Sequence, residues 1–375
     1  MRIPSPAQAL LRALAARAEA LGIPLYAVGG CVRDWVRGAP TRDFDLLTEA
    51  DPEPLAQAAA ELLSATARTY GRFGTWTVSG AVYRVDFARS RRERYPAPAD
   101  LPVVDPAPLA EDLKRRDFTV NSIAVRLTPG FSGKAAADGL IDPFGGTADL
   151  KNKVLRALHP ESFRDDPTRV FRAARYAVRL GLKPRADLVK AARAALAAGH
   201  AARLSRHRLA QELVLILSEK KPEAVLALLK SWGYARLLHP RFRWPRLPKG
   251  AWPVRLGAIV LAMGKEGVGL LDSLPIERSA AAAIREAAGL IGGQAAPRAE
   301  PSDEVRRIVL TRARLAPAAL QPVFLGGPDL ENSGIPRGPR WGEILDEAAR
   351  AQWKVKFSTR AAALKWLAGR LKGEK

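Results

Sequence analysis

The chain has 375 residues, of which 47% are hydrophobic, so it is long enough for two or more compact units and too apolar for general disorder. The single cysteine, Cys31, excludes a disulfide within the chain, and the four histidines have no spacing typical of a zinc site. No apolar stretch approaches the length of a membrane span, so we expect a soluble cytoplasmic protein with neither a membrane partner nor zinc.

The net charge of +22 comes from one part of the sequence. Residues 1–150 contain 18 basic and 18 acidic side chains, whereas residues 151–375 contain 42 basic and 20 acidic ones. A neutral part followed by a strongly basic part is typical of a protein that grips a polyanion and performs chemistry on its end. The alternative is a basic surface that is solvated everywhere and has no specific partner.

The predicted elements change from mixed to helical along the chain. Apolar residues at helical spacing predict an amphipathic helix within Met1 to Leu21. Short apolar runs predict strands at Leu25 to Val28, Asp43 to Leu47, Thr75 to Val78, Val82 to Ala88 and Val120 to Leu127, with helices between them. Arg89 to Ala110 is rich in Pro and Arg, so we expect a long unstructured connector there. Beyond Pro143 nearly everything is expected to be helical.

A glycine pair follows the first predicted strand. Gly29 and Gly30 have no Cβ, so backbone N–H groups there can approach an anion, and the start of the next helix adds partial positive charge. Arg33 and Arg37 lie four residues apart and share one face of that helix. The segment is therefore predicted to bind phosphate groups.

Three carboxylates follow on predicted strands. Asp43 and Asp45 are two residues apart, so both point to the same side of their strand, where they repel each other unless a cation lies between them. Such oxygen ligands suit Mg²⁺, which proteins usually hold with one or two carboxylates plus substrate phosphates. Asp86 interrupts another apolar strand and is the candidate third carboxylate, with a solvent-facing strand residue as the alternative.

Two clusters of charged residues come later in the chain. The first runs from Glu111 to Ala124 and contains Arg-Arg-Asp-Phe-Thr-Val-Asn at Arg115 to Asn121. The second, from Phe163 to Arg172, is predicted to open a helix, with Asp165 or Asp166 as its cap and Pro167 in its first turn. Asp166 and Arg169 are three residues apart and are therefore expected to be neighbours on one helix face.

In this order, the segments resemble the motifs of the class II tRNA nucleotidyltransferases, the family of CCA-adding enzymes, their CC-adding and A-adding relatives, and bacterial poly(A) polymerases. The resemblance spans Tyr26 to Leu217 and includes the segment from Asp142 to Leu150. It implies an α+β fold: a polymerase β-like nucleotidyltransferase head with a mixed sheet and flanking helices at 1–143, followed by an all-helical neck at 144–217 and a basic helical body and tail at 218–375 that binds tRNA.

The resemblance also implies roles for individual residues. Asp43 and Asp45 would hold Mg²⁺ and Asp86 would assist them, while Asp166 and Arg169 would read the base edge of the nucleotide. The remaining nucleotide-binding candidates, for triphosphate and sugar, are Gly29, Gly30, Arg33, Arg116, Asp117, Asn121 and Arg172. The chain departs from the family pattern at Asp165, where relatives carry Glu, and at His207, where they commonly carry an acid.

The implied activity is template-independent addition of C, A or both to the 3′ end of tRNA, with CTP and ATP as substrates. Two Mg²⁺ ions would assist attack of the RNA 3′-hydroxyl on the α-phosphate. A poly(A) polymerase of the same class is the first alternative, because it would share the metal site, the ribose site and the basic body. A catalytically silent RNA-binding protein is the second, and the intact carboxylate pair argues against it.

Overall fold

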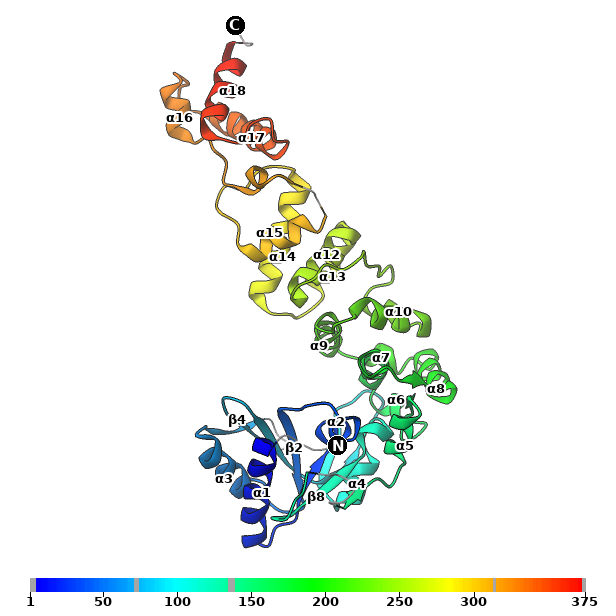
Figure 1. The fold of residues 1–375 in the computed structure, drawn as a ribbon. Helices are drawn as coiled ribbons and strands as arrows, with labels where there is room; N and C mark the ends of the chain where they lie inside the picture. Colours follow the sequence, from blue (N-terminus) through cyan, green and yellow to red (C-terminus); the bar gives the residue numbers. More distant parts are fainter. Residues whose placement is uncertain (1–4, 71–73, 134–138, 313–314, 373–375) are drawn as a thin grey trace. The chain divides into compact units, whose positions relative to one another are not determined.

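The computed structural model describes residues 5–70, 74–133, 139–312 and 315–372 (Figure 1). The chain forms two compact units, one made of residues 1–204 with 231–233 and the other of residues 205–230 with 234–375. The finer division of the sequence at residues 143 and 217 remains a prediction. In the part of the chain that the structure describes, no helix is both long and apolar enough to cross a membrane.

A seven-stranded mixed sheet forms the centre of the first unit, with strand order β3-β4-β5-β2-β1-β8-β9. Strands β2 and β5 are parallel, and each of the other neighbouring pairs in this described sheet is antiparallel. The strands are β1 (Leu25–Val28), β2 (Asp43–Thr48), β3 (Ala67–Tyr70), β4 (Thr75–Ser79), β5 (Arg84–Arg89), β8 (Ala124–Leu127) and β9 (Leu140–Ile141). The predicted mixed sheet, followed by a helical part, is confirmed.

Helices cover both faces of this sheet. α1 (Ser5–Ala20) and α3 (Glu53–Leu63) pack together on one face (Figure 1). The buried side chains of α1 include Leu10, Leu11, Leu14 and Ala18, as its helical spacing predicts, while residues 1–4 of the predicted helix lie outside the described residues. On the other face, Val28 and Leu47 pack against Leu109 and Leu113 of α4 (Leu109–Lys114). Asp43 and Asp45 precede Leu47 by four and two residues on β2, so they point to the same face of the sheet as Leu47, the α4 face.

The expectation of an unstructured connector at Arg89 to Ala110 is wrong. The segment forms an antiparallel hairpin of β6 (Arg91–Arg94) and β7 (Val103–Pro106). Asp105 of β7 pairs with Arg92 at 3.4 Å and with Arg94 at 3.6 Å. The side chains that face each other across the hairpin include opposite charges, and a search for alternating apolar residues does not detect such a pattern.

The predicted strand at Val120 to Leu127 is correct only from Ala124 onward. Its first residues belong to a 3-10 turn, η1 (Thr119–Asn121), in which Asn121 N–H donates to Phe118 O at 2.9 Å. The turn follows Arg115 to Phe118, so the polar residues of this segment lie on irregular backbone rather than along a strand.

The segment from Asp142 to Leu150 braces this turn. The Asp142 carboxylate caps α5 (Gly146–Lys151) by accepting from Gly146 N at 2.7 Å and Thr147 N at 2.9 Å. The Asp149 carboxylate accepts from the Thr119 hydroxyl, and Gly146 packs so closely on Thr119 that a Cβ there would overlap its carbonyl oxygen. The family-like segment therefore acts structurally, by fixing η1.

The first unit continues in helices, and the second unit is helical in its described residues. The first contains α2 (Gly30–Arg37), α6 (Ser162–Asp165), α7 (Thr168–Leu180) and α8 (Ala186–Ala197), with the two-residue strands β10 (Val154–Leu155) and β11 (Lys183–Pro184). α10 (Pro222–Trp232) belongs in part to each unit. The second also contains α9 (Arg206–Leu217), α11 (Ala235–Leu238), α12 (Trp252–Met263), α13 (Lys265–Asp272), α14 (Arg278–Gly293), α15 (Asp303–Leu310), η3 (Pro317–Leu320), α16 (Gly327–Asn332), α17 (Pro339–Trp353) and α18 (Arg360–Lys372).

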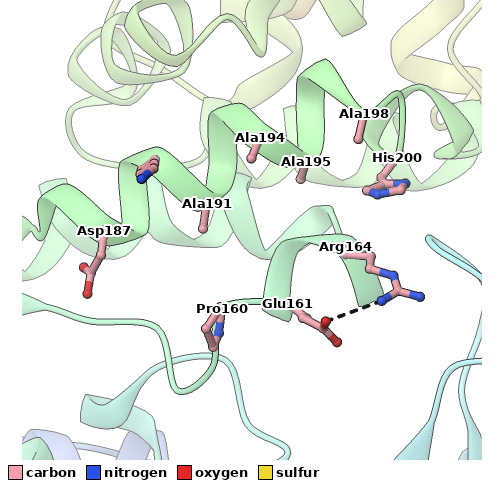
Figure 2. A pocket seen from close by; sticks show the side chains of 10 residues that line it. Pro160, Glu161, Arg164, Asp187, Ala191, Ala194, Ala195, Ala198 and His200 are labelled. Carbon is pink, nitrogen blue, oxygen red and sulfur yellow. Dashed lines mark ion pairs between the residues drawn. The ribbon is translucent and has the colours of Figure 1, made fainter.

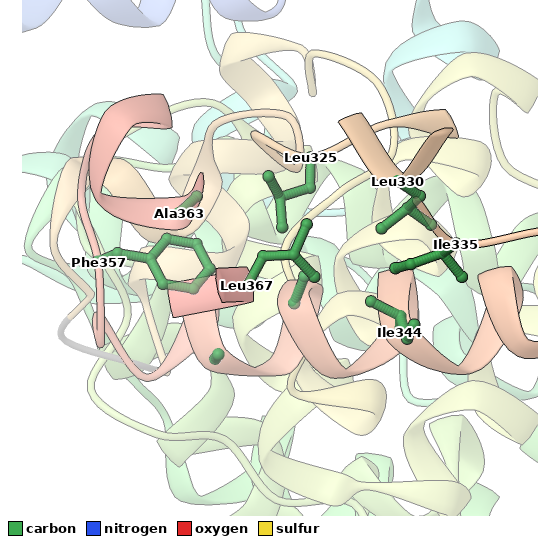
Figure 3. Close-up of a cluster of buried hydrophobic side chains, with 9 residues drawn as sticks. Leu325, Leu330, Ile335, Ile344, Phe357, Ala363 and Leu367 are labelled. Atoms are coloured by element: carbon green, nitrogen blue, oxygen red, sulfur yellow. The ribbon is translucent and has the colours of Figure 1, made fainter. Parts of the chain in front are cut away.

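An apolar cluster holds the last three helices together. Figure 3 shows Leu330 of α16, Ile344 of α17 and Leu367 of α18 meeting in this cluster. The buried Gln352 amide links this cluster to the segment before it, because its Nε2 donates to the carbonyl oxygens of Ala318 and Gln321 and its Oε1 accepts from Phe324 N at 3.0 Å. The segment that leads into α16 is therefore tied to α17.

Replacement of Gly146 by Ala should destabilise the first unit, because the added Cβ would overlap the Thr119 backbone, which η1 holds in place. We expect a loss of about 1–3 kcal/mol or more, measured by denaturant unfolding. Gly130→Ala is the matched control, since the nearest atom to a Cβ at that position is Thr128 Oγ1, at an ordinary contact distance of 3.9 Å. Equal stabilities of the two variants would contradict the bracing role of α5.

Candidate active site

The glycine turn at the end of β1 brings distant residues together. Gly29 has φ of 68°, in the region that favours glycine. A Cβ built on Gly29 would lie 2.7 Å from Arg116 Nη1 and 3.9 Å from Asp45 Oδ2, and one on Gly30 would lie 3.7 Å from Asp45 Oδ2. The turn therefore lies directly against a guanidinium and a carboxylate, in space that a larger residue would fill.

The three predicted carboxylates lie on adjoining strands. Asp43 and Asp45 share one face of β2, and Asp45 is the register partner of Asp86 on β5. Asp86 also accepts from the Thr77 hydroxyl and from Arg84 Nε at 3.2 Å. The structure thus brings the three carboxylates to one face, with Asp86 already bound to neighbouring side chains.

Asp45 is in an environment that disfavours its negative charge. Asp45 is exposed to solvent, yet desolvation by the surrounding protein atoms raises its pKa, and the charges of Asp86 and Asp43 raise it further against the opposing effects of Arg116 and Arg33. Within the described residues, no three His, Cys, Asp or Glu side chains form a ready-made metal cage. A pair of repelling carboxylates is nevertheless the arrangement that suits Mg²⁺ when substrate phosphates complete its ligands.

Arg33 is buried and held on several sides. Its Nη1 donates to Asn121 Oδ1 at 2.6 Å, and its Nε and Nη2 each donate to the Asp34 carboxylate at 3.0 Å. Its guanidinium also lies over the Tyr176 ring, 5.4 Å from the centroid. Arg37, which was predicted to share a helix face with Arg33, pairs with the same Asp34 at 3.5 Å. The two arginines of α2 are thus linked through one acid.

Asp112 is a positioning residue that the sequence reasoning did not identify. Its fully buried carboxylate accepts from Arg115 Nη2 at 2.6 Å through one oxygen and from Arg116 Nη2 at 2.9 Å through the other. Burial alone would raise the pKa of Asp112, but Arg116 and Arg115 lower it below its usual value. The only sequence signal was the spacing of three and four residues on a helix end.

Asp117 joins the η1 segment to α7. One oxygen of this buried carboxylate accepts from Asn121 Nδ2 at 3.0 Å, and the other accepts from Arg172 Nε at 2.7 Å. Burial would raise the pKa of Asp117, but Arg172 and the Asn121 hydrogen bond lower it. Three of the predicted nucleotide-binding residues therefore form one network.

Tyr176 also escaped the sequence reasoning. Besides Arg33, it has Arg172 and Arg179 beside its ring, with guanidinium carbons 5.4 and 5.9 Å from the centroid. Its hydroxyl accepts from Arg172 Nη2 at 3.2 Å. The available signal was its helical spacing of four and three residues from these two arginines.

The predicted base-selecting residues lie at the start of α7. Asp166 accepts from Thr168 N at 3.0 Å and from its hydroxyl at 2.6 Å, but the N-cap of α7 is Pro167 rather than the predicted Asp165 or Asp166. The buried Arg169 donates to Ser162 Oγ at 2.8 Å, to Arg115 O at 2.9 Å and to the Tyr95 hydroxyl at 3.4 Å. Arg169 is thereby joined to the backbone of the segment that carries Arg116 and Asp117.

A separate hollow of about 460 Å³ lies between α6 and α8. Figure 2 shows Ala191, Ala194 and Ala195 of α8 along one side of it, opposite Pro160 and the Glu161–Arg164 ion pair. None of the predicted catalytic or nucleotide-binding residues lines it. The chemistry is therefore assigned to the carboxylates and arginines around the glycine turn rather than to this hollow.

Replacement of Asp112 by Ala should destabilise the first unit by about 3–5 kcal/mol at pH 7, because two partly buried guanidinium groups lose a shared carboxylate and Arg115 alone keeps another, Glu93. The lowered pKa makes this contribution complete above the unfolded value near 4, and it is lost as pH falls through the lower folded pKa. Denaturant unfolding between pH 3 and 7 should therefore show the two proteins converging in acid. Glu111→Ala, an exposed acid on the same helix, is the control.

The comparisons with known proteins identify the family that this chain resembles. Residues 25–156 match the family model described as the poly A polymerase head domain. The A-adding tRNA nucleotidyltransferase of Geobacter sulfurreducens is 39% identical over 239 residues, which cover 64% of this chain and 27% of that relative. The chain spans about a quarter of that relative and of the A-adding relative from Aquifex aeolicus, and about half of the one from Halalkalibacterium halodurans.

Two further matches extend over most of the chain. A solved structure of a CCA-adding enzyme in an apo form has a TM-score of 0.72 at 23% identity and covers 98% of this chain and 97% of its own, which supports the fold. Other matched structures are CCA-adding enzymes in complex with ATP, with CTP and with tRNA. The CC-adding tRNA nucleotidyltransferase of Deinococcus radiodurans is 31% identical over 338 residues, which cover 87% of this chain and 83% of that relative. The resemblance inferred from the motifs is confirmed, and this chain belongs to the tRNA nucleotidyltransferase family.

Proposed function

We propose that this chain adds C, A or both to the 3′ end of tRNA, using CTP and ATP. The terminal 3′-hydroxyl of the RNA attacks the α-phosphate of the nucleotide, a phosphodiester bond forms and pyrophosphate leaves. The observation that carries the proposal is the meeting of Gly29, Asp45 and Arg116, which unites a possible metal ligand with phosphate-binding groups. The relatives' names, which specify A-adding, CC-adding or CCA functions, support the same reaction.

Asp43 and Asp45 are the proposed Mg²⁺ ligands, with Asp86 next to them. The fit rests on the shared face of β2 and on the raised pKa of Asp45, since a bound cation would offset both the desolvation and the neighbouring acids that raise this pKa. When bound, Mg²⁺ would activate the 3′-hydroxyl and offset the charge of the leaving pyrophosphate. The protein itself contributes the placement of these carboxylates beside the glycine turn.

The arginines and the glycine turn are the proposed triphosphate site. The backbone at Gly29 and Gly30 can approach phosphate oxygens closely, while Arg33 and Arg116 supply positive charge in fixed orientations. Their internal partners, Asp34 and Asp112, hold the guanidinium groups in place before a nucleotide binds. Little ordering of these side chains is then required on binding.

Base choice is assigned to α7. A carboxylate at Asp166 can accept from the exocyclic amino group of C or A, and the guanidinium of Arg169 can donate to ring acceptors. U and G lack a matching amino donor at that position, so the protein can select without a nucleic-acid template. Asp117, Asn121 and Arg172 are the proposed sugar and phosphate contacts, because their network joins η1 to the same helix.

The positive charge of the sequence beyond residue 150 supports tRNA as the acceptor. These residues carry the whole net charge of +22, which suits a phosphate backbone. A poly(A) polymerase of the same class is the second candidate, favoured by the description of the matched head-domain model. Both candidates would use the same carboxylates, so they differ in the acceptor RNA and in the number of nucleotides added.

An incorporation assay separates the two candidates. The full chain is given tRNA that ends before the first C, or after the second C, with CTP and ATP singly and together, beside an unstructured RNA. We expect addition of at most three nucleotides, to tRNA alone. A long A tract on both RNAs would instead establish the poly(A) polymerase activity, and no addition to either RNA would contradict both.

The Asp43→Ala variant should lower incorporation by at least about a hundredfold, since it removes one of two proposed metal ligands. Asp43 is exposed, so folding and tRNA binding should be nearly unchanged. Thermal unfolding with and without Mg²⁺ and nucleotide gives an independent readout. We expect Mg²⁺ and nucleotide together to raise the Tm of the wild type and of the control Glu19→Ala, but not that of Asp43→Ala. Extension of tRNA at the wild-type rate would contradict this assignment.

A further inference from the structure

The β6–β7 hairpin is joined to the proposed base-selecting arginine by a closed hydrogen-bond network. The Tyr95 hydroxyl accepts from Arg169 Nη2 at 3.4 Å and donates to Glu93 Oε2 at 3.0 Å. The other Glu93 oxygen accepts from Arg115 Nη1 at 2.7 Å, and the Arg115 carbonyl oxygen accepts from Arg169 Nη2 at 2.9 Å. We call these four residues the Tyr95 network.

The network restrains Arg169 from two directions. Ser162 Oγ and Arg115 O hold the guanidinium from α6 and from the end of α4, and both are local to those elements. Tyr95 is the contact that comes from the hairpin, 74 residues away in sequence. Arg169 is only 6% exposed, so a change in any of these contacts shifts the guanidinium within a packed site rather than in solvent.

The contact depends on a neutral phenol that acts as donor and acceptor together. Burial raises the pKa of Tyr95, and Glu93 raises it as well, so the hydroxyl keeps its proton at neutral pH. The hydroxyl therefore lies between a charged donor, Arg169, at 3.4 Å and a charged acceptor, Glu93, at 3.0 Å. The ring itself serves only to carry the hydroxyl to this point.

A second contact from the hairpin reaches the same motif. In the turn between β6 and β7, Ala99 N–H donates to Asp165 O at 3.2 Å. Ala99 has φ of 68°, an uncommon conformation for a residue other than glycine, so the surrounding contacts hold the turn in this form. The hairpin is therefore fixed at two points: the Tyr95 hydroxyl contacts Arg169 of α7, and the turn backbone contacts Asp165 at the end of α6.

We propose that Tyr95 is a positioning residue for base selection, which it serves by fixing the plane of the Arg169 guanidinium through its hydroxyl group. This inference rests on the proposed function. It extends that function by assigning part of the discrimination between C or A and U or G to a side chain of the hairpin. Tyr95 touches neither the metal ligands nor the proposed triphosphate site in the described structure, so its effect is expected on selectivity rather than on the bond-forming step.

The test is the Tyr95→Phe variant, which keeps the ring and removes only the hydroxyl. We measure kcat/KM on tRNA for CTP, ATP, UTP and GTP separately. The ratio of the preferred nucleotide to UTP should fall about three- to tenfold, since one hydrogen bond to a charged group is lost. Tyr26→Phe is the matched control, because that partly buried tyrosine packs against the apolar cluster of Val28, Leu47, Leu109 and Leu113 and has no described side-chain hydrogen bond.

A double-mutant cycle shows whether Tyr95 acts through Arg169. In an Arg169→Ala background, Tyr95→Phe should change the selectivity ratio by less than about twofold, since the partner of the hydroxyl is already gone. The inference would be overturned if Tyr95→Phe lowered the selectivity ratio equally in both backgrounds. It would also be overturned if Tyr95→Phe lowered kcat/KM equally for all four nucleotides. Thermal unfolding is recorded for each variant, so that a folding defect is recognised.

The same experiment separates this inference from the proposed function. Wild type and Tyr26→Phe must extend tRNA with C or A, and failure of both overturns the proposed function together with the role of Tyr95. If both extend tRNA and Tyr95→Phe keeps the wild-type selectivity, the proposed function stands and the inference alone is wrong.

Discussion

The arrangement of the site depends on one buried carboxylate, Asp112, which holds two consecutive arginines in different directions. Arg116 is directed to the glycine turn, where its Nη1 lies against Gly29, and Arg115 is directed to Glu93 of the hairpin. A buried carboxylate is favourable only when its partners remain in place, so the interaction fixes geometry more than it adds stability. Asp112 is therefore connected through Arg116 to the proposed phosphate site and through Arg115 to the proposed base-selecting residue Arg169.

The acids around the site fall into two kinds, and their pKa values show the difference. Asp112 and Asp117 have lowered pKa values because each is matched with arginines inside the protein. Asp45 has a raised pKa, because desolvation and two neighbouring acids outweigh the arginines beside it. A carboxylate whose charge is left partly uncompensated by its own protein is the one expected to bind an added cation, whereas compensated acids act as supports.

Local patterns predicted the elements that carry the carboxylates and the glycine turn. β1 begins and ends where the apolar run does, and the alternation of Asp43 and Asp45 places both on one face. Glu93, Tyr95 and Asp112 could not be assigned in this way, because their partners lie on other elements and no periodicity encodes them. The hairpin was missed for a different reason: its backbone pairs as a ladder, but its side chains are largely charged, so no apolar alternation marks it.

The short segment from Arg115 to Asn121 links the two halves of the proposed reaction. At its beginning, the Arg115 carbonyl group and the Arg116 side chain connect Arg169 with the glycine turn; at its end, Asn121 binds Arg33 and Asp117. Such a segment can transmit the position of a selected base to the carboxylates only if its own backbone is rigid. α5 fixes that backbone, since Gly146 lies directly against the Thr119 carbonyl group and Asp149 accepts from the Thr119 hydroxyl, so the segment at Asp142 to Leu150 supports the proposed site through η1.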